Sequence, residues 1–255
     1  MSFAQDHFNF KTTAAFRCLS VAFLFVFLLS PVFAQKRFSK TYPAGQNVTL
    51  QLTNRSGTVT VEGWNKQEIS ISAYLEAPAA NIEPQSLSGT IYINLVRDNQ
   101  GRMDVGNVNF NIKVPFGSSV DIETKIGNLS VSNVRGARVR AHITSEGDIT
   151  LTNIVSTNVS AQNGIGDIFF DGQIQNGGTY RFSSIRGNIN LRIPFNSSFR
   201  LVATAPSTRS IDLGPFSGGD LRMVGDGRRI AGQNGAGDAS ISITNQRGTI
   251  AFIRR

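Results

Sequence analysis

Between residues 127 and 193 the chain repeats one pattern of polar and apolar positions four times. Each copy begins with glycine and then Asn or Asp, after which apolar and polar residues alternate. The copies begin at Gly127, Gly147, Gly166 and Gly187, so their spacings are 20, 19 and 21 residues. Alternation with a period of two is typical of strands with one buried face. Because a unit of this length cannot bury its apolar face alone, the pattern predicts repeats that stack on one another.

Each repeat supplies two short predicted strands with a turn between them. The strand after the glycine carries apolar residues that we expect to point inward: Leu129, Val131, Ile149, Leu151, Ile168, Phe170, Ile189 and Leu191. A second alternating segment lies between the glycine motifs, with apolar positions at Val120, Ile122, Val139, Ala141, Ile143, Val159, Ala161, Tyr180, Phe182, Phe199 and Leu201. The predicted fold class is all-β, a β-solenoid similar to a β-helix, with repeats of roughly 20 residues.

The regions outside the repeats carry weaker versions of the same pattern. Alternating runs predict further strands at 48–52, 58–61, 69–74, 239–244 and 249–253. Residues 91–114 predict a hairpin with a turn at 98–101. Residues 205–238 are rich in Gly, Ser, Arg and Pro and predict an irregular loop. We expect residues 35–255 to form a single domain.

The first 34 residues have the features of an export signal. Lys11 and Arg17 precede or flank an apolar run at 19–29, and we expect cleavage after Ala34. A membrane anchor is the alternative, but about eleven residues at 1.5 Å each fall short of the ~30 Å hydrocarbon core. We therefore predict a signal peptide at residues 1–34 and no transmembrane segment in the mature chain. The predicted location is the periplasm, the cell surface or the extracellular space.

Composition and charge narrow the set of partners. The chain has 25 Lys and Arg residues and 17 Asp and Glu residues, and removal of the leader changes the net charge from +8 to +7. A basic excess favours acidic partners, so we expect an anionic polysaccharide, a lipid headgroup or another envelope protein. Basic residues are not clustered with aromatic ones, so nucleic acid is not expected. The single cysteine, Cys18, lies in the predicted leader, which leaves no disulfide in the mature chain.

Four segments carry a resemblance to a known family. They are SGTVTVEGW at 56–64, the paired phrases VPFGSS at 114–119 and IPFNSS at 193–198, and the closing segment 237–253. In this order they resemble the bacterial putative-adhesin family of unknown function, DUF4097, over residues 38–253. The resemblance implies a β-solenoid that is exported or tethered to a membrane, and it brings no catalytic residues.

Few residues indicate catalysis or metal binding. His142 is the only histidine after the leader, and we expect it to be exposed or hydrogen-bonded rather than a general base. No nucleophile motif or cysteine ligand accompanies it, so neither a cofactor nor a metal site is expected. Five acidic residues are the remaining route to a carbohydrate-active enzyme: Asp121, Glu123, Asp148, Asp167 and Asp171. Their spacing selects no pair at glycosidase distance, so we expect no enzyme.

The polar residue after each glycine has a structural explanation and a functional one. Glycine permits a tight corner, and an Asn or Asp side chain can hydrogen-bond the backbone of its own turn. The residues concerned are Asn128, Asp148, Asp167 and Asn188. We expect a ladder of turn hydrogen bonds, with a column for a cation or substrate as the alternative.

Arginines on the second strand of the repeats give the most specific prediction of a binding surface. The outward positions hold Arg138, Arg140, Arg181 and Arg200. With repeats stacked about 4.8 Å apart, these side chains would form a ladder about 15 to 20 Å long that can hold carboxylates or phosphates. Scattered solubilising charge is the alternative. We predict an exported, non-catalytic binding protein, adhesin-like, that engages an anionic glycan, lipid or protein partner. A structural or envelope-stress scaffold is the second hypothesis.

Overall fold

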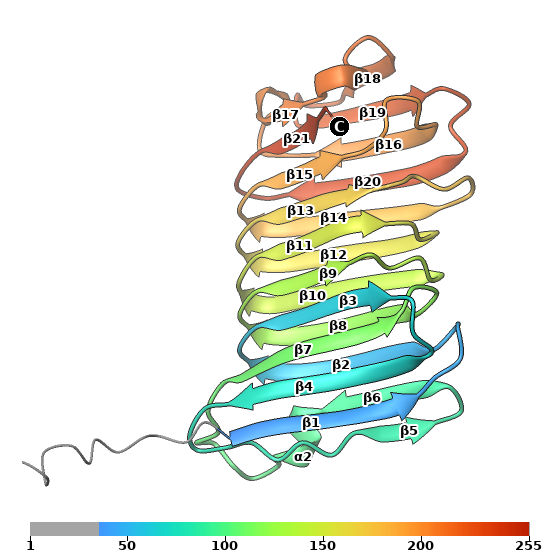
Figure 1. The fold of residues 1–255 in the computed structure, drawn as a ribbon. Helices are drawn as coiled ribbons and strands as arrows, with labels where there is room; N and C mark the ends of the chain where they lie inside the picture. The colour runs from blue at the N-terminus through green and yellow to red at the C-terminus, as the bar shows by residue number, and fades with distance from the viewer. Residues whose placement is uncertain (1–35, 255) are drawn as a thin grey trace, which may run out of the picture. The chain divides into compact units, whose positions relative to one another are not determined.

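Each repeat of the sequence forms one rung of two strands joined at a glycine corner. In the computed structural model, which describes residues 36–254, the strand before the glycine lies in one large sheet and the strand after it lies in a second. Neighbouring rungs pair in parallel, and Figure 1 shows them stacked above one another. The two-strand repeat expected from the glycine spacing is therefore present.

The strands that follow the corners lie in sheet A, which has ten strands in all. In spatial order they are β1 (Lys36–Pro43), β4 (Glu68–Leu75), β7 (Val108–Pro115), β3 (Val59–Trp64), β9 (Leu129–Ser132), β11 (Ile149–Ile154), β13 (Ile168–Gly172), β15 (Ile189–Arg192), β21 (Ile250–Ile253) and β17 (Ile211–Asp212).

The strands that precede the corners lie in sheet B, which has eleven strands in all. In spatial order they are β18 (Asp220–Val224), β19 (Arg229–Asn234), β16 (Phe199–Thr204), β20 (Ala239–Asn245), β14 (Thr179–Arg186), β12 (Asn158–Ile165), β10 (Arg138–Glu146), β8 (Ser119–Ile126), β2 (Thr49–Ser56), β6 (Thr90–Asn94) and β5 (Gln85–Leu87).

The core lies between the two sheets and consists of columns of apolar side chains. Leu151 of β11 is in register with Val131 on one side and with Phe170 on the other, and all three are fully buried. The inward positions expected from the alternation are all buried, which confirms the predicted face of each strand. Each buried aliphatic side chain contributes about 1.5 to 3 kcal/mol to stability, so the columns supply most of the driving force for stacking.

The rungs do not all stack in chain order. The last rung, β20 and β21, is inserted between β14–β15 and β16–β17. Likewise, β7 lies next to β3 in sheet A, although β4, β5 and β6 come between β3 and β7 in the sequence. Antiparallel strands close the ends, with β1–β4–β7 in sheet A and β16–β19–β18 in sheet B. A simple succession of layers is thus correct for β8 to β15 and wrong for the two ends.

Two predicted connections differ from the structure. Residues 91–114 do not form a hairpin, because β6 lies in sheet B and β7 in sheet A, with the short helix α2 (Leu95–Asp98) between them. The segment 205–238 is more ordered than an irregular loop. It contains the 3-10 turns η1 (Thr208–Ser210) and η2 (Gly214–Phe216), the short strand β17, and the antiparallel pair β18–β19.

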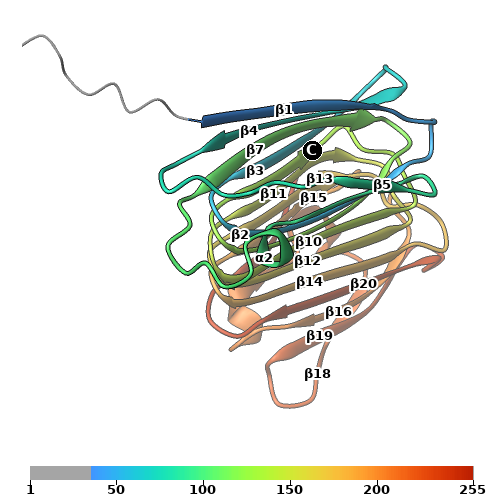
Figure 2. The same ribbon diagram turned by 90° about the horizontal axis from the view of Figure 1, so that it is seen from below.

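Helical structure is sparse and lies at the ends of the stack. Figure 2, which looks along the stack from below, shows α2 over the end of the core next to β2, and its Leu95 is buried. Among residues 36–254, no helix has the length and apolar character needed to span a membrane. The predicted signal peptide at 1–34 lies outside the described residues.

Candidate functional site

The outer face of sheet B brings the predicted arginines onto neighbouring strands. Arg140 of β10 is in register with Asp121 of β8 on one side and with Ser160 of β12 on the other. Ser160 is in turn in register with Arg181 of β14. Arg140 and Arg181 therefore share one row and are separated by a single strand, about 10 Å at the usual strand spacing.

Arg140 is held by two carboxylates of the preceding rung. Its Nη1 lies 2.8 Å from Asp121 Oδ1, and its Nη2 lies 3.0 Å from Glu123 Oε2. His142 joins the cluster, because its Nδ1 lies 3.4 Å from Glu123 Oε2 and 3.1 Å from Arg140 Nη2. All four side chains point outward, since they occupy alternate positions on two adjacent strands.

The ion pairs change the acid–base properties of the cluster. The hydrogen bond from Arg140 lowers the pKa of Glu123 below its ordinary value, against an opposing effect of burial, and His142 lowers it further. Burial alone would lower the pKa of Arg140, but the hydrogen bonds to Asp121 and Glu123 outweigh it and raise that pKa. The cluster is therefore a fixed array of charges in which Arg140 is neutralised by its neighbours.

Three of the four predicted arginines surround a shallow hollow. Arg138, Arg140 and Arg181 line it together with polar residues of the intervening strands, and its volume is about 240 Å³. The polar lining residues are Asn158, Ser160 and Thr179. Arg138 and Arg181 are exposed, and neither makes an ion pair with any residue between 36 and 254. The hollow thus combines two guanidinium groups without acidic partners and a floor of hydroxyl and amide groups.

Arg200 lies apart from this hollow, which corrects the predicted ladder. β20 separates its strand, β16, from β14, and Arg200 is in register with Ser240, which is aligned with Thr179 rather than with Arg181. Its Nε donates a hydrogen bond to the carbonyl oxygen of Gly237 at 2.9 Å. The displacement follows from the inserted last rung, because every residue of β16 is moved one strand further along the sheet.

The five acidic residues considered for catalysis lie in three separate places. Asp121 and Glu123 bind Arg140 on sheet B, whereas Asp171 is buried at the end of β13 and its Oδ2 accepts a hydrogen bond from Arg192 at 2.8 Å. Asp148 and Asp167 lie at the glycine corners. Among residues 36–254, no group of three or more His, Cys, Asp or Glu side chains is arranged to hold a metal ion.

The corner residues form the predicted hydrogen-bond ladder. The side-chain oxygen of each one accepts a hydrogen bond from the backbone N–H at the equivalent position of the next rung, at 2.7 to 3.1 Å. The acceptors are Asn128, Asp148, Asp167 and Asn188, and the donors are Asp148, Asp167, Asn188 and Thr249. The expected ladder of hydrogen bonds at the Gly-Asn and Gly-Asp pairs is therefore present, but each side chain binds the backbone of the next rung rather than that of its own turn.

A second polar column on the inner side of the corners was not predicted. Asn163 Nδ2 donates to the carbonyl oxygen of Gly147 at 2.6 Å, and Asn245 Nδ2 donates to that of Gly187 at 2.8 Å. Both asparagines are buried. The signal was available, because each lies at an inward position of its strand where the alternation requires an apolar residue. The pairing of Arg140 with Asp121 was also available, since both occupy the same outward position of consecutive repeats.

The solved structures that match this chain share little sequence with it. A putative cell adhesion protein from Clostridium sporogenes is 14% identical with a TM-score of 0.48, and the match covers 86% of this chain and 98% of that one. A putative adhesin from Bacteroides fragilis is 10% identical with a TM-score of 0.38, with coverage of 86% and 98%. A putative lipid binding protein from Parabacteroides distasonis is 10% identical with a TM-score of 0.35, with coverage of 86% and 97%.

The family comparison covers nearly all of the described residues. No curated protein matches the sequence. The model of one family, Toastrack DUF4097, matches residues 33–252. This is the family that the phrases at 56–64, 114–119 and 193–198 resemble. The chain belongs to the Toastrack DUF4097 family.

Proposed function

We propose that this protein is an exported, non-catalytic binding protein that holds an anionic partner against the outer face of sheet B. The observation that carries the proposal is the hollow between Arg138, Arg140 and Arg181, in which two guanidinium groups have no acidic partner among residues 36–254. We further infer that the stacked rungs form a β-solenoid. The order of its rungs departs from chain order at both ends.

The geometry of the hollow suits a carboxylate, sulfate or phosphate group. An anion above Ser160 would lie between Arg140 and Arg181, which flank it in the same row. Arg138 approaches from the adjacent row, where it is in register with Asn158. Guanidinium groups bind such anions through two parallel N–H donors, and hydroxyl and amide groups of the floor can donate as well. Because Asp121 and Glu123 neutralise Arg140, Arg138 and Arg181 supply the net positive charge.

The arrangement of acidic groups supports binding rather than catalysis. Asp121 and Glu123 are both engaged by the same arginine, so neither is held ready to transfer a proton to a substrate. Asp148 and Asp167 act as acceptors in the corner ladder. The three solved relatives bear names of adhesion and lipid-binding proteins, which agrees with this proposal.

An affinity experiment tests the hollow directly. Full-length protein is applied to immobilised alginate, a polymer of uronic acids, and to phosphatidylglycerol vesicles, and the salt concentration that releases it is measured. The double variant Arg138→Ser, Arg181→Ser should bind about tenfold or more weakly, because a hydrogen bond to a charged group contributes about 1.5 to 3 kcal/mol. Retention on alginate or on vesicles distinguishes a polysaccharide from a lipid headgroup.

A charge-matched variant separates the site from general electrostatics. Arg222→Ser, Arg228→Ser removes the same charge from exposed positions at or beside the β18–β19 pair. It should be released at the salt concentration of the unmodified protein. If the two double variants are released together, the attraction comes from net charge and the hollow is not the binding site.

A further inference from the structure

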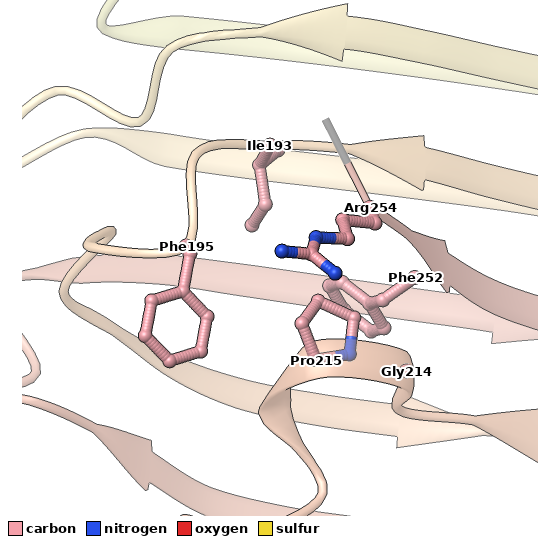
Figure 3. Close-up of a pocket in the computed structure, with 6 residues that line it drawn as sticks. All are labelled: Ile193, Phe195, Gly214, Pro215, Phe252 and Arg254. Atoms are coloured by element: carbon pink, nitrogen blue, oxygen red, sulfur yellow. The ribbon is translucent and has the colours of Figure 1, made fainter.

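A mainly apolar pocket opens where the strands of sheet A end, near the C-terminal end of the stack. Its volume is about 660 Å³, within the usual range of sites for small molecules. Figure 3 shows the lining residues: Ile193, Phe195, Gly214, Pro215, Phe252 and Arg254. The pocket lies between the end of β15, the end of β21 and the turn η2.

The apolar wall of the pocket rests on a cluster of buried aromatic rings. Phe195 is 71% exposed, yet its ring stacks on the buried Phe216, with centroids 6.2 Å apart and planes inclined by 18°. Phe216 packs edge-on against Phe199 and Phe252, at centroid distances of 5.2 and 5.6 Å. An exposed aromatic ring held by a buried aromatic cluster is a formed surface rather than a freely moving side chain.

The chain contains an internal comparison for this exposed ring. The phrases at 114–119 and 193–198 place a phenylalanine at the same point of the connection that leads from sheet A to sheet B, at Phe116 and Phe195. At Phe116 the guanidinium carbon of Arg135 lies 5.2 Å from the ring centroid, and the Arg135 N–H binds the Phe116 carbonyl oxygen at 2.7 Å. No cation covers Phe195 among residues 36–254, so the equivalent apolar position is open at this end of the stack.

Among residues 36–254, one charged group lines this pocket. In Figure 3 the guanidinium group of Arg254 lies between Ile193 and Pro215, on the side of the pocket away from Phe195's ring. Arg254 forms no ion pair within the described part of the chain. An apolar wall with a cation at its border is complementary to a molecule that has an apolar body and an anionic head.

We propose that this pocket binds an anionic amphiphile, with its hydrocarbon chain against Phe195, Ile193 and Phe252 and its carboxylate or phosphate on Arg254. The site is separate from the hollow on sheet B and does not depend on the function proposed for it. The same chemistry is offered by a free fatty acid and by a lipid taken from a bilayer, and the experiment distinguishes these sources.

Calorimetry with a short series of fatty acids tests the pocket. Octanoate and decanoate are titrated into the full-length protein below their micelle concentrations, with 1-octanol as the uncharged probe. Each added methylene should tighten binding by about fourfold, the factor expected for burying one CH₂ group. The segment 1–35 is common to all variants, so differences between variants report on the pocket.

Two variants separate the cation from the apolar wall. Arg254→Gln should weaken binding of octanoate by about tenfold and leave 1-octanol unchanged, because only the carboxylate uses the charge. Phe195→Ser should weaken both ligands, and it should fold, because the ring is exposed. Met223→Ser, at a 65% exposed apolar position on β18, is the matched control and should change neither affinity.

Several results would overturn the proposal. One is the absence of saturable decanoate binding. Another is equal affinity of the unmodified protein and of Phe195→Ser for decanoate. A third is self-association that Phe195→Ser abolishes, because a second copy of the chain would then occupy the pocket. If the protein binds phosphatidylglycerol vesicles and decanoate displaces it from them, the ligand comes from a bilayer. If it binds decanoate but not vesicles, the ligand is a free amphiphile. The variant Arg138→Ser, Arg181→Ser should bind decanoate normally, so failure of one site is distinguishable from failure of the other.

Discussion

Tyr180 shows how a single polar group is accommodated in the apolar interior. Among residues 36–254 it is the largest fully buried side chain. Its hydroxyl donates to the carbonyl oxygen of Ser156 at 2.9 Å and accepts from the Gln175 N–H at 2.7 Å. Burial of the phenol raises the pKa of Tyr180, and the hydrogen bond from Gln175 lowers it by a smaller amount. The hydroxyl thus ties two loops to the core.

The raised pKa of Tyr180 predicts a specific loss of stability at alkaline pH. The folded chain keeps the phenol proton to a higher pH than the unfolded chain, whose tyrosines ionise near pH 10. Unfolding therefore releases a proton above about pH 10, and the free energy of unfolding falls as the pH rises. Urea unfolding at pH 8 to 11 should show that Tyr180→Phe is less stable at pH 8, by about 1 to 3 kcal/mol. Its further decline with pH should be shallower. Parallel declines would contradict the assignment.

At the scale of residues, the alternation of the sequence predicts burial well and polar contacts poorly. Every apolar inward position of the repeats is buried because period-two patterning is a property of the strand itself. The partners of Tyr180 come from connecting loops at Ser156 and Gln175, whose paths no strand pattern determines. That Arg254 and Phe195 line the same pocket depends in the same way on the paths of the β15–β16 connection and of the residue after β21.

The glycine corner is the element that repeats most faithfully. Gly127, Gly147, Gly166 and Gly187 all have positive φ angles, between 115° and 144°. A β-carbon on any of them would collide with the carbonyl oxygen of the glycine in the preceding rung. The corner therefore requires glycine for two reasons: its positive φ angle and the close approach of the preceding rung.

Two glycine substitutions distinguish these requirements. Gly166→Ala should lower the free energy of unfolding by about 3 kcal/mol or more, because it adds a backbone collision to an unfavourable φ of 130°. Gly177 has a φ of 69° and open space around it, so Gly177→Ala should cost only about 1 kcal/mol. Thermal or urea unfolding measures both. Equal costs would show that stacking does not constrain the corner.

At the scale of elements, the sequence predicts rungs but misassigns some connections. The apolar runs at 91–96 and 108–114 show the same alternation whether their strands pair with each other or with different partners, so the sequence does not distinguish the two cases. Only the intervening α2 and the coil that follows it carry the chain across to sheet A. The ordered pair β18–β19 was missed because its glycines and arginines interrupt the alternation, and Leu221 and Ile230 are its only well-buried strand residues.

The order of the rungs is a property of the whole molecule, and the sequence of a single rung does not determine it. Ile241 and Ile243 present the same inward pattern as the repeats at 120–182, so their strand fits equally well at the end of the stack or within it. Its observed place, between β14 and β16, sets the position of Arg200 relative to Arg181. The arginine hollow could be predicted from consecutive repeats, whereas the displacement of Arg200 could not.

Truncation tests how much the inserted rung, β20 and β21, contributes to the stability of the fold. Ending the chain after Asp238 removes four large buried side chains, Ile241, Ile243, Ile250 and Phe252. At about 1.5 to 3 kcal/mol each, their loss approaches or exceeds the 5 to 15 kcal/mol by which proteins of this kind are usually stable. We expect the truncated protein to be unfolded or aggregated in circular dichroism and gel filtration. A chain ending after Ile253 is the control and should fold. A compact truncated monomer would contradict the role assigned to this rung.

The inserted rung also determines when folding can finish. Ribosomes deliver a chain from its N-terminus, so β14 and β16 are both made before the strand that lies between them. Until residues 239–253 are available, the two edges have no partner that matches their final register. The stack therefore completes its core only after residues 239–253 have been synthesised. Until then, β14 and β16 must avoid pairing directly with each other.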